Sequence, residues 1–304
     1  MNNINEYLDK IILGDCRNYL PKLPKESIHL FLSDIPYGIG LDEWDVLHQN
    51  TNSAYLGQSP AQSGKKGFKR RGKPLNGWSA ADRKIVHEYE EWCYEWGEMI
   101  FPIMKKGASV FVFGARRTIH RAIVALEDAG FILRDVLAWK KVSAHHRSQR
   151  VEIVFERRNE IALMQKWQGW RLGNLAPIYE PIAWLFKPYD LTIADNLIQN
   201  EVGAMNIDET LVNGKNPTNI LEFGFERDEI KVHEAQKPVK LIEYLIKLTT
   251  RENHLIIDPF MGSGTTAVAA AHLKRHFIGF EINENYYQNA INRLEEKAKQ
   301  LCFI

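Results

Sequence analysis

A glycine-containing loop between an apolar run and an alanine-rich segment is the part of the sequence best suited to chemistry. Residues 254–266 read HLIIDPFMGSGTT, which predicts a buried strand that ends at Asp258 and a helix that starts directly after the loop. Gly262 and Gly264 allow positive φ and a close approach of a ligand to the backbone, and the free N–H groups of the helix start favour an anionic group. The next apolar run ends at Glu281, where a carboxylate accepts hydrogen bonds from ribose hydroxyls. Because the spacing matches neither GxGxxG nor a Walker loop, it predicts a nucleoside cofactor rather than NAD or a nucleoside triphosphate.

This loop resembles the S-adenosylmethionine loop of the DNA amino-methyltransferases, the family that methylates N6 of adenine or N4 of cytosine. The resemblance implies that the backbone of residues 260–264 surrounds the methionine part of the cofactor and that Glu281 holds its ribose. The cofactor-binding residues implied in this part of the chain are Asp258, Phe260, Met261, Gly262, Ser263, Gly264, Thr265, Thr266 and Glu281.

A second motif, SDIPYG at residues 33–38, follows another apolar run and resembles the family's catalytic tetrapeptide, (D/N/S)PPY. An exocyclic amine is a weak nucleophile because its lone pair is delocalised into the ring. The resemblance implies that the Asp34 carboxylate and the Ile35 carbonyl accept the two N–H bonds of that amine. Pro36 then stiffens the turn, and Tyr37 offers an aromatic face to a base that has left the duplex stack. Ile35 stands where the family has proline, and because this position acts through its carbonyl, we expect looser geometry rather than lost activity.

A third motif, HEAQKP at residues 233–238, resembles the HxxQKP sequence that the family places just before its cofactor loop. Lys237 is thereby implied to face the cofactor carboxylate, and proline suits the start of a helix. Asp15 and Cys16, after the first apolar run, resemble the family's contact with the cofactor adenine. The further cofactor-binding residues are therefore Asp15, Cys16, His233, Gln236, Lys237 and Pro238.

Apolar runs that alternate with helix-like segments must position these motifs, and they predict a largely parallel α/β sheet. The expected strands lie near residues 10–14, 27–33, 108–113, 136–139, 182–186, 255–257 and 277–280. Residues 82–105 predict a helix whose Trp92 and Trp96 belong to the core.

The order of the motifs, with the catalytic tetrapeptide first and the cofactor loop last, matches the β group of the family. The resemblance therefore implies a Rossmann-like, circularly permuted methyltransferase fold with seven mostly parallel strands. Its first strand is expected at the sheet edge near the last helix, with the chain termini close together. Residues 1–187 and 233–304 form the catalytic domain in this interpretation, residues 41–80 a long mobile loop that faces DNA, and residues 188–232 an inserted target-recognition module.

Two basic stretches are candidates for contact with DNA phosphates, which Lys and Arg neutralise. The first lies in the polar loop after the tetrapeptide. The second follows the strand that ends at Trp139, whose ring either belongs to the core or stacks on the flipped base. The DNA-binding candidates are Lys65, Lys66, Lys69, Arg70, Arg71, Lys73, Trp139, Lys140, Lys141, Arg147 and Arg150.

The composition is that of an ordinary globular protein, with 45% hydrophobic and 25% charged residues in a chain of 304. A net charge of +1 excludes a wholly basic nucleic-acid coat protein but not a locally basic surface. Three scattered cysteines are too few for a disulfide framework or a structural zinc site, and no apolar run suits a membrane span or a signal core. We therefore expect a cytoplasmic protein with reduced thiols and without a metal site.

The sequence thus predicts a site-specific DNA methyltransferase that moves a methyl group from S-adenosylmethionine to N6 of adenine in duplex DNA, by base flipping and direct transfer. Asp34 favours adenine, because serine at that position is more typical of N4-cytosine enzymes. The open alternatives are an N4-cytosine enzyme, an RNA or protein-amide methyltransferase, and an inactive relative that only binds DNA or cofactor, for which Ile35 is the sole support. A homodimer and a cognate restriction endonuclease are further partners that the resemblance suggests.

Overall fold

The computed structural model describes residues 4–37, 80–144, 149–173, 175–226, 229 and 236–301. Its strands are β1 (Lys10–Leu13), β2 (Ile28–Asp34), β3 (Met104–Phe113), β4 (Ile132–Lys140), β5 (Gln149–Arg150), β6 (Arg171–Leu172), β7 (Tyr179–Phe186), β8 (Ile220–Glu222), β9 (Leu255–Asp258) and β10 (His276–Glu281). Its α-helices are α1 (Ala80–Ile100), α2 (Ile119–Asp128), α3 (Val151–Glu156), α4 (Ile161–Lys166), α5 (Ile193–Asn200), α6 (Val239–Thr249), α7 (Thr265–His272) and α8 (Glu284–Leu301). None of the helices in these described ranges combines the length and the apolar character needed to cross a membrane.

Eight strands form one sheet in the order β1-β10-β9-β2-β3-β7-β4-β8. Neighbouring strands are parallel, except that β7 is antiparallel to both β3 and β4. The mostly parallel α/β sheet predicted from the sequence is therefore confirmed, and β1 lies at its edge, beside β10 and against α8. The sheet has eight strands rather than the expected seven, because β8 adds beside β4.

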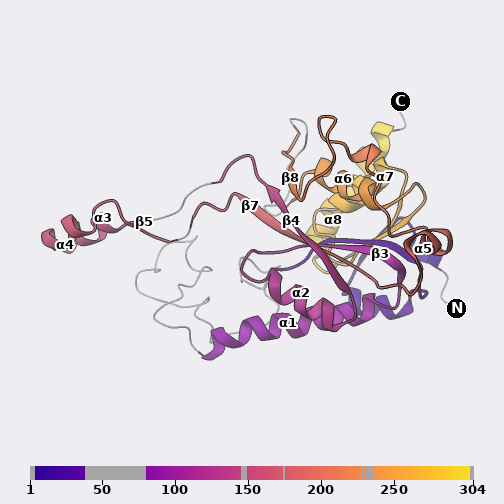
Figure 1. Ribbon diagram of the computed structural model, residues 1–304, viewed down its shortest axis with the longest axis horizontal. Coiled ribbons are helices and arrows are strands. Elements are labelled where there is room, and N and C mark those ends of the chain that lie inside the picture. Colours follow the sequence, from indigo (N-terminus) through magenta and orange to yellow (C-terminus); the bar gives the residue numbers. More distant parts are fainter. Residues whose placement is uncertain are drawn as a thin grey trace.

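Helices cover both faces of the sheet (Figure 1). On one face α1 and α2 pack over a buried cluster that includes Trp96 and Val110. On the other face α6, α7 and α8 pack over a second cluster, which includes Leu245 and Phe111. Val110 and Phe111 are neighbours in β3, and successive side chains of a strand point to opposite faces. Both faces are thus buried, which leaves the ends of the strands as the place for a site.

Helix α1 ends at Ile100, earlier than the sequence predicted. The N–H of Phe101 still donates to the carbonyl of Gly97 (2.9 Å), but Pro102 has no N–H with which to continue the ladder. The chain then turns directly into β3 at Met104.

Residues 188–232 were expected to form an inserted module, and their described part lies against the body of the molecule. Helix α5 contacts β3, the 3-10 helix Asp208–Thr210 contacts α6, and β8 joins the main sheet. Asn196 of α5 is buried, and its Nδ2 donates to the carbonyls of Lys106 (3.2 Å) and Val202 (2.8 Å). The target-recognition role of this segment stays a prediction.

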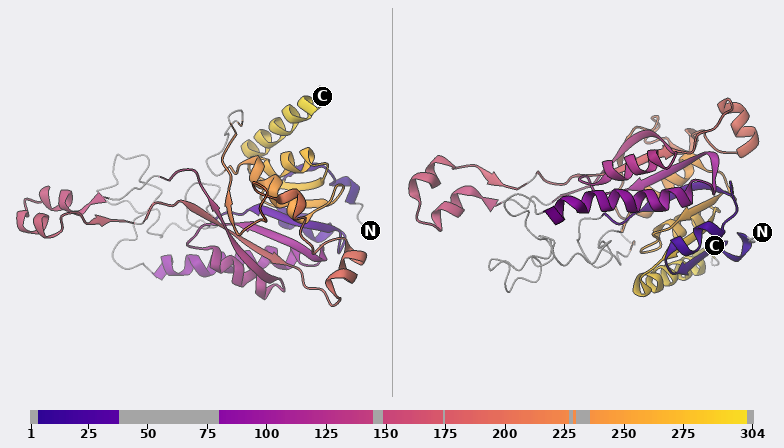
Figure 2. Two further views of the ribbon diagram at one scale, coloured as in Figure 1. Left: turned by 45° about the horizontal axis from the view of Figure 1, so that its top comes forward. Right: turned by 90° about the horizontal axis from the view of Figure 1, so that it is seen from below.

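A separate small unit projects from the body between β4 and β7, as Figures 1 and 2 show. It contains β5, α3, α4 and β6, and β5 pairs with β6 in antiparallel register. We call residues 149–173 the arm. No residue of the arm is buried. The sequence indicated a basic stretch in this region but no separate unit.

Candidate active site

A pocket of about 430 Å³ opens where the parallel strands β1, β2, β9 and β10 end. Ligands of open α/β sheets bind at this carboxyl edge. Motifs that are far apart in the sequence meet here. The predicted site residues that line the pocket are Asp15, Cys16, Asp34, Pro36, Gln236, Lys237, Asp258, Phe260, Met261, Gly262, Ser263, Thr265, Thr266 and Glu281.

The two loop glycines differ in their surroundings. Gly262 has φ +53°, lines the pocket and donates its N–H to the Glu281 carboxylate (2.7 Å). Gly264 has φ +79° and precedes α7, and a Cβ built there would lie 2.9 Å from the Cβ of Ala290 in α8. Gly264 therefore permits the close packing of α8 against the loop, whereas Gly262 faces the space for a ligand.

Glu281 ends β10 and turns its carboxylate toward the loop. One oxygen accepts the N–H of Gly262, and the other accepts the N–H of Asn283 (2.8 Å). Burial raises the pKa of Glu281, although these hydrogen bonds act in the opposite direction. Each carboxylate oxygen has two lone pairs, so both can still accept a hydroxyl donor from a ligand.

Asp258 joins the cofactor loop to the strand that carries the catalytic tetrapeptide. Its Oδ1 accepts the Ser33 hydroxyl (2.6 Å) and the N–H of Phe260 (3.1 Å). Burial raises the pKa of Asp258 to about 6, and these hydrogen bonds oppose the rise. Because Ser33 directly precedes Asp34, this contact ties the positions of the two motifs together.

An aromatic wall faces the loop from α1. The ring of Phe260 lies 5.2 Å from that of Trp92 and 5.8 Å from that of Trp96, and both tryptophans line the pocket. Trp96 is buried, as expected, but Trp92 is only partly so. Helical spacing alone does not separate a core tryptophan from one that faces a ligand. Other lining residues that the sequence did not single out are Gly14, Arg17, Leu32, Phe113, Ile242, Pro259, Phe280, Ile282, Asn283 and Tyr286.

Asp15 and Cys16 lie at the pocket end of β1. The Asp15 carboxylate accepts hydrogen bonds from the guanidinium (2.7 Å) and the N–H (3.0 Å) of Arg17, which hold its pKa below the usual value. Burial raises the pKa of Cys16 to about 12, so its thiol stays protonated at neutral pH. A buried, protonated thiol is a packing group and not a nucleophile.

A cluster of polar side chains from three distant parts of the chain meets beside the pocket. The Lys237 Nζ lies 2.5 Å from Asp34 Oδ2, 3.0 Å from Glu180 Oε1 and 3.1 Å from the Tyr37 hydroxyl. The Tyr37 hydroxyl donates to Glu180, and Lys141 pairs with the other oxygen of Glu180 (2.7 Å). We call Asp34, Tyr37, Glu180 and Lys237 the catalytic cluster.

Glu180 is the member of this cluster that the sequence analysis missed. It lies at the start of β7, and its role depends on two partners that are remote in the sequence. The sequence did offer one signal for Glu180, an acidic residue next to an apolar run. The strand predicted over residues 182–186 was too short to include it.

The charges of the cluster support one another. Burial opposes the positive charge of Lys237, but the two carboxylates outweigh it and raise its pKa. Burial likewise opposes the charge of Glu180, but Lys237 and Lys141 outweigh it and lower its pKa. At Asp34 burial dominates and raises the pKa to about 6; the charge of Lys237 opposes the rise and that of Glu180 adds to it. At neutral pH the cluster thus holds two carboxylates around one ammonium group.

One oxygen of Asp34 is left without a donor. Oδ2 binds Lys237, whereas Oδ1 is buried and accepts no hydrogen bond from the part of the chain that the structure describes. A buried acceptor without a donor costs about 1–3 kcal/mol. Asp34 lines the pocket, and 24% of its side chain is exposed. The exposed part of the side chain is thus not Oδ1, which the surrounding residues shield from solvent.

Ile35 and Tyr37 lie outside the pocket lining. Ile35, which stands where the family motif has proline, is fully buried. Its side chain packs in the core cluster under α1 and α2. Tyr37 is also buried, and the Thr118 hydroxyl donates to its carbonyl (2.9 Å). The Lys237 ammonium lies 5.7 Å from the centre of the Tyr37 ring, so this ring is held by the cluster. Its contact with a flipped base stays a prediction.

Trp139, a candidate for stacking on the base, is a core residue. It is 4% exposed, and its Nε1 donates to the carbonyl of Phe223 (2.9 Å). A ring buried in this way has no free face for a base, so burial corrects the stacking interpretation. The candidates that lie outside the described residues are Lys65, Lys66, Lys69, Arg70, Arg71, Lys73, Arg147 and His233.

The remaining basic candidates follow β4 toward the arm. Lys140 pairs with Glu222 (2.7 Å) on the surface, and Arg150 pairs with Glu152 (2.6 Å) at the start of the arm. Lys141 holds Glu180 of the catalytic cluster. The second basic stretch thus connects the catalytic cluster with the arm.

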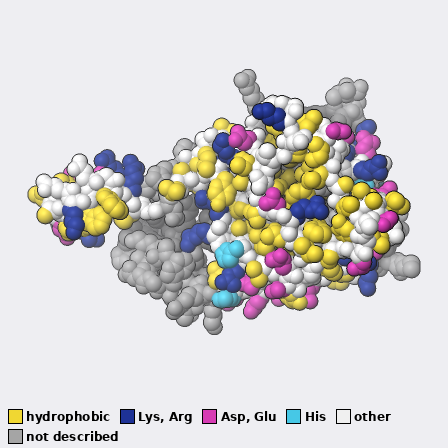
Figure 3. Space-filling model, in the orientation of Figure 1, with side chains coloured by type: hydrophobic (Ala, Val, Ile, Leu, Met, Phe, Trp, Pro, Cys, Tyr) yellow, Lys and Arg dark blue, Asp and Glu magenta, His cyan; other side chains and the backbone are white. Residues whose placement is uncertain are grey.

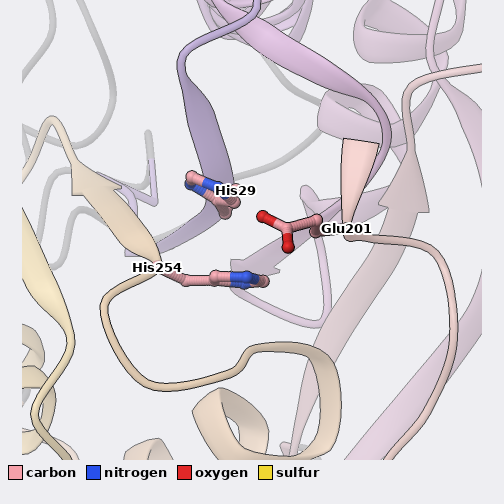
Figure 4. A group of neighbouring side chains, drawn as sticks. All are labelled: His29, Glu201 and His254. Atoms are coloured by element: carbon pink, nitrogen blue, oxygen red, sulfur yellow. The ribbon is translucent and has the colours of Figure 1, made fainter. Parts of the chain in front are cut away.

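Two histidines and a glutamate gather at the amino edge of the sheet, away from the pocket (Figure 4). The rings of His29 and His254 stack at 4.1 Å, near Glu201. The Nδ1 of His29 accepts the N–H of Leu255 (3.1 Å), and the Nδ1 of His254 accepts that of Arg251 (3.2 Å). Burial lowers the pKa of His29 to about 3 and that of His254 to about 4, so both rings are neutral. A neutral ring that accepts at Nδ1 carries its proton at Nε2, so neither ring has a lone pair left for a metal.

Comparison with known proteins identifies the family of the chain. The family model described as DNA methylase (N6_N4_Mtase) matches residues 28–292. The type II methyltransferase M.HindIII of Haemophilus influenzae is 49% identical over 304 residues, which cover 97% of this chain and 98% of that protein.

Solved structures have the same fold at low sequence identity. The PvuII DNA methyltransferase (cytosine-N4-specific) has a TM-score of 0.61 at 18% identity, over 95% of this chain and 90% of that one. A putative DNA modification methylase from Thermus thermophilus, TTHA0409, in complex with S-adenosyl-L-methionine, has a TM-score of 0.56 at 17% identity, over 95% and 93% of the two chains. The resemblance inferred from the motifs is therefore confirmed, and this chain belongs to the N6/N4 family of DNA methylases.

Proposed function

We propose that this chain transfers the methyl group of S-adenosylmethionine to the exocyclic N6 of an adenine in duplex DNA, by base flipping and direct transfer. The observation that carries the proposal is the Asp34 carboxylate, which lines the same pocket as the glycine loop and has one oxygen without a donor among the described residues. Membership of the DNA methylase family and the 49% identity to a type II methyltransferase support it.

The pocket fits S-adenosylmethionine in size and in the chemistry of its walls. Its volume is within the range of small-molecule sites, about 300–1,000 Å³. Glu281 would hold the ribose hydroxyls, the backbone of residues 260–264 would surround the methionine part, and Asp15 and Cys16 would lie at the adenine. When bound, the cofactor supplies a methyl group on a positively charged sulfur. The aromatic wall of Phe260 and Trp92 suits such a cation, because aromatic faces attract positive charge.

Asp34 would orient and activate the amine. Its carboxylate would accept one N–H of the amine and shift electron density to the nitrogen, which would take up the methyl group that the cofactor supplies. The nitrogen then carries an extra proton, and that proton passes to Asp34. Burial raises the pKa of Asp34 to about 6, which suits a group that accepts a proton and later releases it to water at neutral pH.

Glu180 would act as a positioning residue. Its carboxylate binds the Lys237 ammonium and accepts a hydrogen bond from the Tyr37 hydroxyl. The same ammonium binds Asp34. Lys237 then fixes Oδ2 of Asp34 and thereby the orientation of the carboxylate. In this arrangement Lys237 serves the amine side of the site, in addition to the contact with the cofactor carboxylate predicted from the motif.

The DNA substrate implies further partners and a location. Lys140 and Lys141 lie at the end of β4 on the way to the arm and Arg150 lies at the start of the arm, where they would face phosphates of the duplex. Because the proposed substrate is duplex DNA, we place the enzyme in the cytoplasm. A homodimer and a cognate restriction endonuclease remain predictions.

The test is mass spectrometry of nucleosides from DNA incubated with the protein and isotopically labelled S-adenosylmethionine. Label in N6-methyladenine is the expected result. Label in N4-methylcytosine would keep the mechanism and overturn the choice of base. No label, with the cofactor still bound, would overturn the proposal in favour of an RNA or protein substrate, or of an inactive relative.

In the same assay Asp34→Ala should retain cofactor binding and lose about 10²–10⁴-fold in methyl transfer, the range for loss of a positioned acid or base. Asp190→Ala is the matched control, because that carboxylate is 90% exposed and pairs only with Lys106 at the surface. Wild-type activity in Asp34→Ala would remove Asp34 from the mechanism.

A further inference from the structure

We propose that the arm, residues 149–173, binds the DNA duplex beside the target base. This proposal rests on the proposed function, because it takes duplex DNA as the substrate, and it adds the part of the chain that contacts the duplex. It assigns to the arm the contact with target DNA that the sequence predicted for residues 188–232. The described part of that segment packs against the body.

The arm starts from the catalytic edge of the sheet. Strand β4 runs parallel to β3 and β2, so its carboxyl end lies on the same side as Asp34, and the chain continues from there toward the arm. Lys141, the first residue after β4, pairs with Glu180 of the catalytic cluster. The return strand β7 begins at Tyr179, directly before Glu180. A duplex whose target base lies at Asp34 must therefore pass the root of the arm.

The chain is long enough to reach along the duplex. Eight residue steps separate Lys141 from Gln149, which at about 3.5 Å each span at most roughly 28 Å. In Figures 1 and 2 the arm extends away from the body in every view, and its helices pack on each other and on β5. It is thus placed to contact base pairs beyond the one that is flipped.

The arm lacks a core of its own. Helices α3 and α4 have six residues each, far below the length of about 12–15 at which isolated helices become stable. The contacts that hold it include the pairing of β5 with β6, the packing of α3 on α4, the edge-to-face pair of Trp167 and Trp170 (5.2 Å) and the bond from the Val151 N–H to the Trp170 carbonyl (2.9 Å). A unit with so little internal stability is best explained by a partner surface that orders it on binding.

The charge of the arm matches phosphate. Among its 25 positions five are basic and three are acidic, a net charge of +2, so the rest of the chain, with +1 in total, sums to −1. One of the acidic residues, Glu152, is neutralised by Arg150. Figure 3 shows the Lys and Arg side chains gathered on the exposed sides of the arm. The basic residues are Arg150, Arg157, Arg158, Lys166 and Arg171.

Exposed apolar side chains lie between these charges. Ile161 is 64% exposed, Trp170 61% and Leu172 51%. Apolar groups of this kind contact the thymine methyl in the major groove or enter between base steps, which surface charges alone do not do. A second copy of the chain is the less favourable occupant, because two arms of net charge +2 repel each other.

The test compares duplex binding by arm variants and by a matched control. The double variant Arg157→Gln and Arg158→Gln removes two exposed charges from the arm. Lys25→Gln and Lys274→Gln remove two exposed charges from the amino edge of the sheet. Fluorescence anisotropy with a short labelled duplex, at several salt concentrations, gives the affinity and its salt slope for each protein. Calorimetry with S-adenosylmethionine shows that the pocket is intact.

We expect the arm variant to bind the duplex roughly tenfold more weakly, with a slope of log K against log salt that is smaller by about 2, because each lost phosphate contact lowers the slope by about 0.9. The control should match the wild type. An unchanged slope and affinity in the arm variant would overturn the proposal. So would a dimer of the wild type that becomes a monomer in the arm variant with duplex affinity unchanged, because the occupant is then a second copy.

A replacement of residues 149–173 by a short Gly-Ser linker covers the case in which the point variants are too mild. Because no arm residue is buried, the body should keep its cofactor affinity within about twofold while duplex affinity falls by more than tenfold. Retained duplex affinity would contradict the proposal. This outcome is separate from the proposed function: wild-type protein that binds duplex through the arm but forms no methylated base contradicts only the reaction.

Discussion

The catalytic cluster and the arm place charged side chains in opposite environments. In the cluster Lys237 is 4% exposed and shared between two carboxylates, and Glu180 is buried between two lysines. In the arm the charged side chains are at the surface, and the pair of Arg150 and Glu152 is local in the sequence. Buried charges are strongly coupled because little water screens them, whereas surface pairs contribute about 0–1 kcal/mol.

This difference fits the role proposed for each region. A proton acceptor for an amine needs a fixed position and a shifted pKa, and both come from burial and from partners on several elements. A surface that binds phosphate must keep its charges accessible and gains from their release of counterions. Substitutions in the cluster should therefore affect stability and chemistry together, and substitutions in the arm should affect DNA binding alone.

The largest effect is expected for Lys237→Met. It leaves Asp34 and Glu180 as two buried carboxylates without their common partner, so methyl transfer should be lost and the free energy of unfolding should fall by about 3–5 kcal/mol. Urea unfolding and the nucleoside assay measure the two effects. Lys140→Met is the control, because Lys140 pairs with Glu222 at the surface, where the loss should stay below about 1 kcal/mol. Equal losses in the two variants would mean that burial does not distinguish them.

A smaller, more specific effect is expected for Glu180→Gln. The charge of Glu180 raises the pKa of Asp34, so its removal should lower that pKa. In the wild type Asp34 is protonated below about pH 6, and a protonated carboxyl no longer accepts the proton of the amine, so kcat should fall as the pH drops through this value. In the variant the acid limb should move to lower pH, with kcat reduced about tenfold, as for a group that positions the base.

The matched variant for this experiment is Glu222→Gln, which removes a surface carboxylate paired with Lys140. Its pH profile should follow that of the wild type. If Glu180→Gln lowers kcat without any movement of the acid limb, Glu180 supports the fold only and is not electrostatically linked to Asp34.

The smallest effect concerns two glycines with almost the same backbone conformation. Gly264 in the pocket loop has φ +79° and Gly169 in the arm has φ +81°. A Cβ at Gly264 would lie 2.9 Å from Ala290, whereas a Cβ at Gly169 meets nothing within 4 Å. Gly264→Ala should therefore lower the free energy of unfolding by about 1–3 kcal/mol more than Gly169→Ala, since only the first overpacks its site.

Thermal or urea unfolding of the two alanine variants measures this difference directly. Because the backbone strain is nearly the same in both, it cancels in the comparison. A difference close to zero would show that α8 can move away from the loop at no cost, and that packing does not hold the pocket wall in place.

Residues that act through their own local turn could be predicted from the sequence. The glycine loop, Asp258 and Glu281 lie at strand ends, and the motif around Asp34 follows an apolar run, so alternating elements were enough to bring them to one edge of the sheet. The parallel sheet and the position of β1 at its edge were predicted on the same basis.

Residues whose role depends on contacts between distant elements were missed or misread. Glu180 reaches Tyr37 and Lys237 only because β7 runs antiparallel between β3 and β4. Trp139 had a basic neighbourhood in the sequence, but the sheet buries its ring. The arm and the eighth strand also depend on which segments pack on the body, and composition does not reveal that.

The sequence by itself determined the pocket loops, the motif that contains Asp34 and the family, because each depends on residue types at short spacing. Only the tertiary structure decided which oxygen of Asp34 lacks a donor among the described residues, which carboxylates hold Lys237, and which part of the chain projects from the body. The physical reason is that turn geometry is set by neighbouring residues, whereas burial and charge coupling are set by whatever the fold brings next to them.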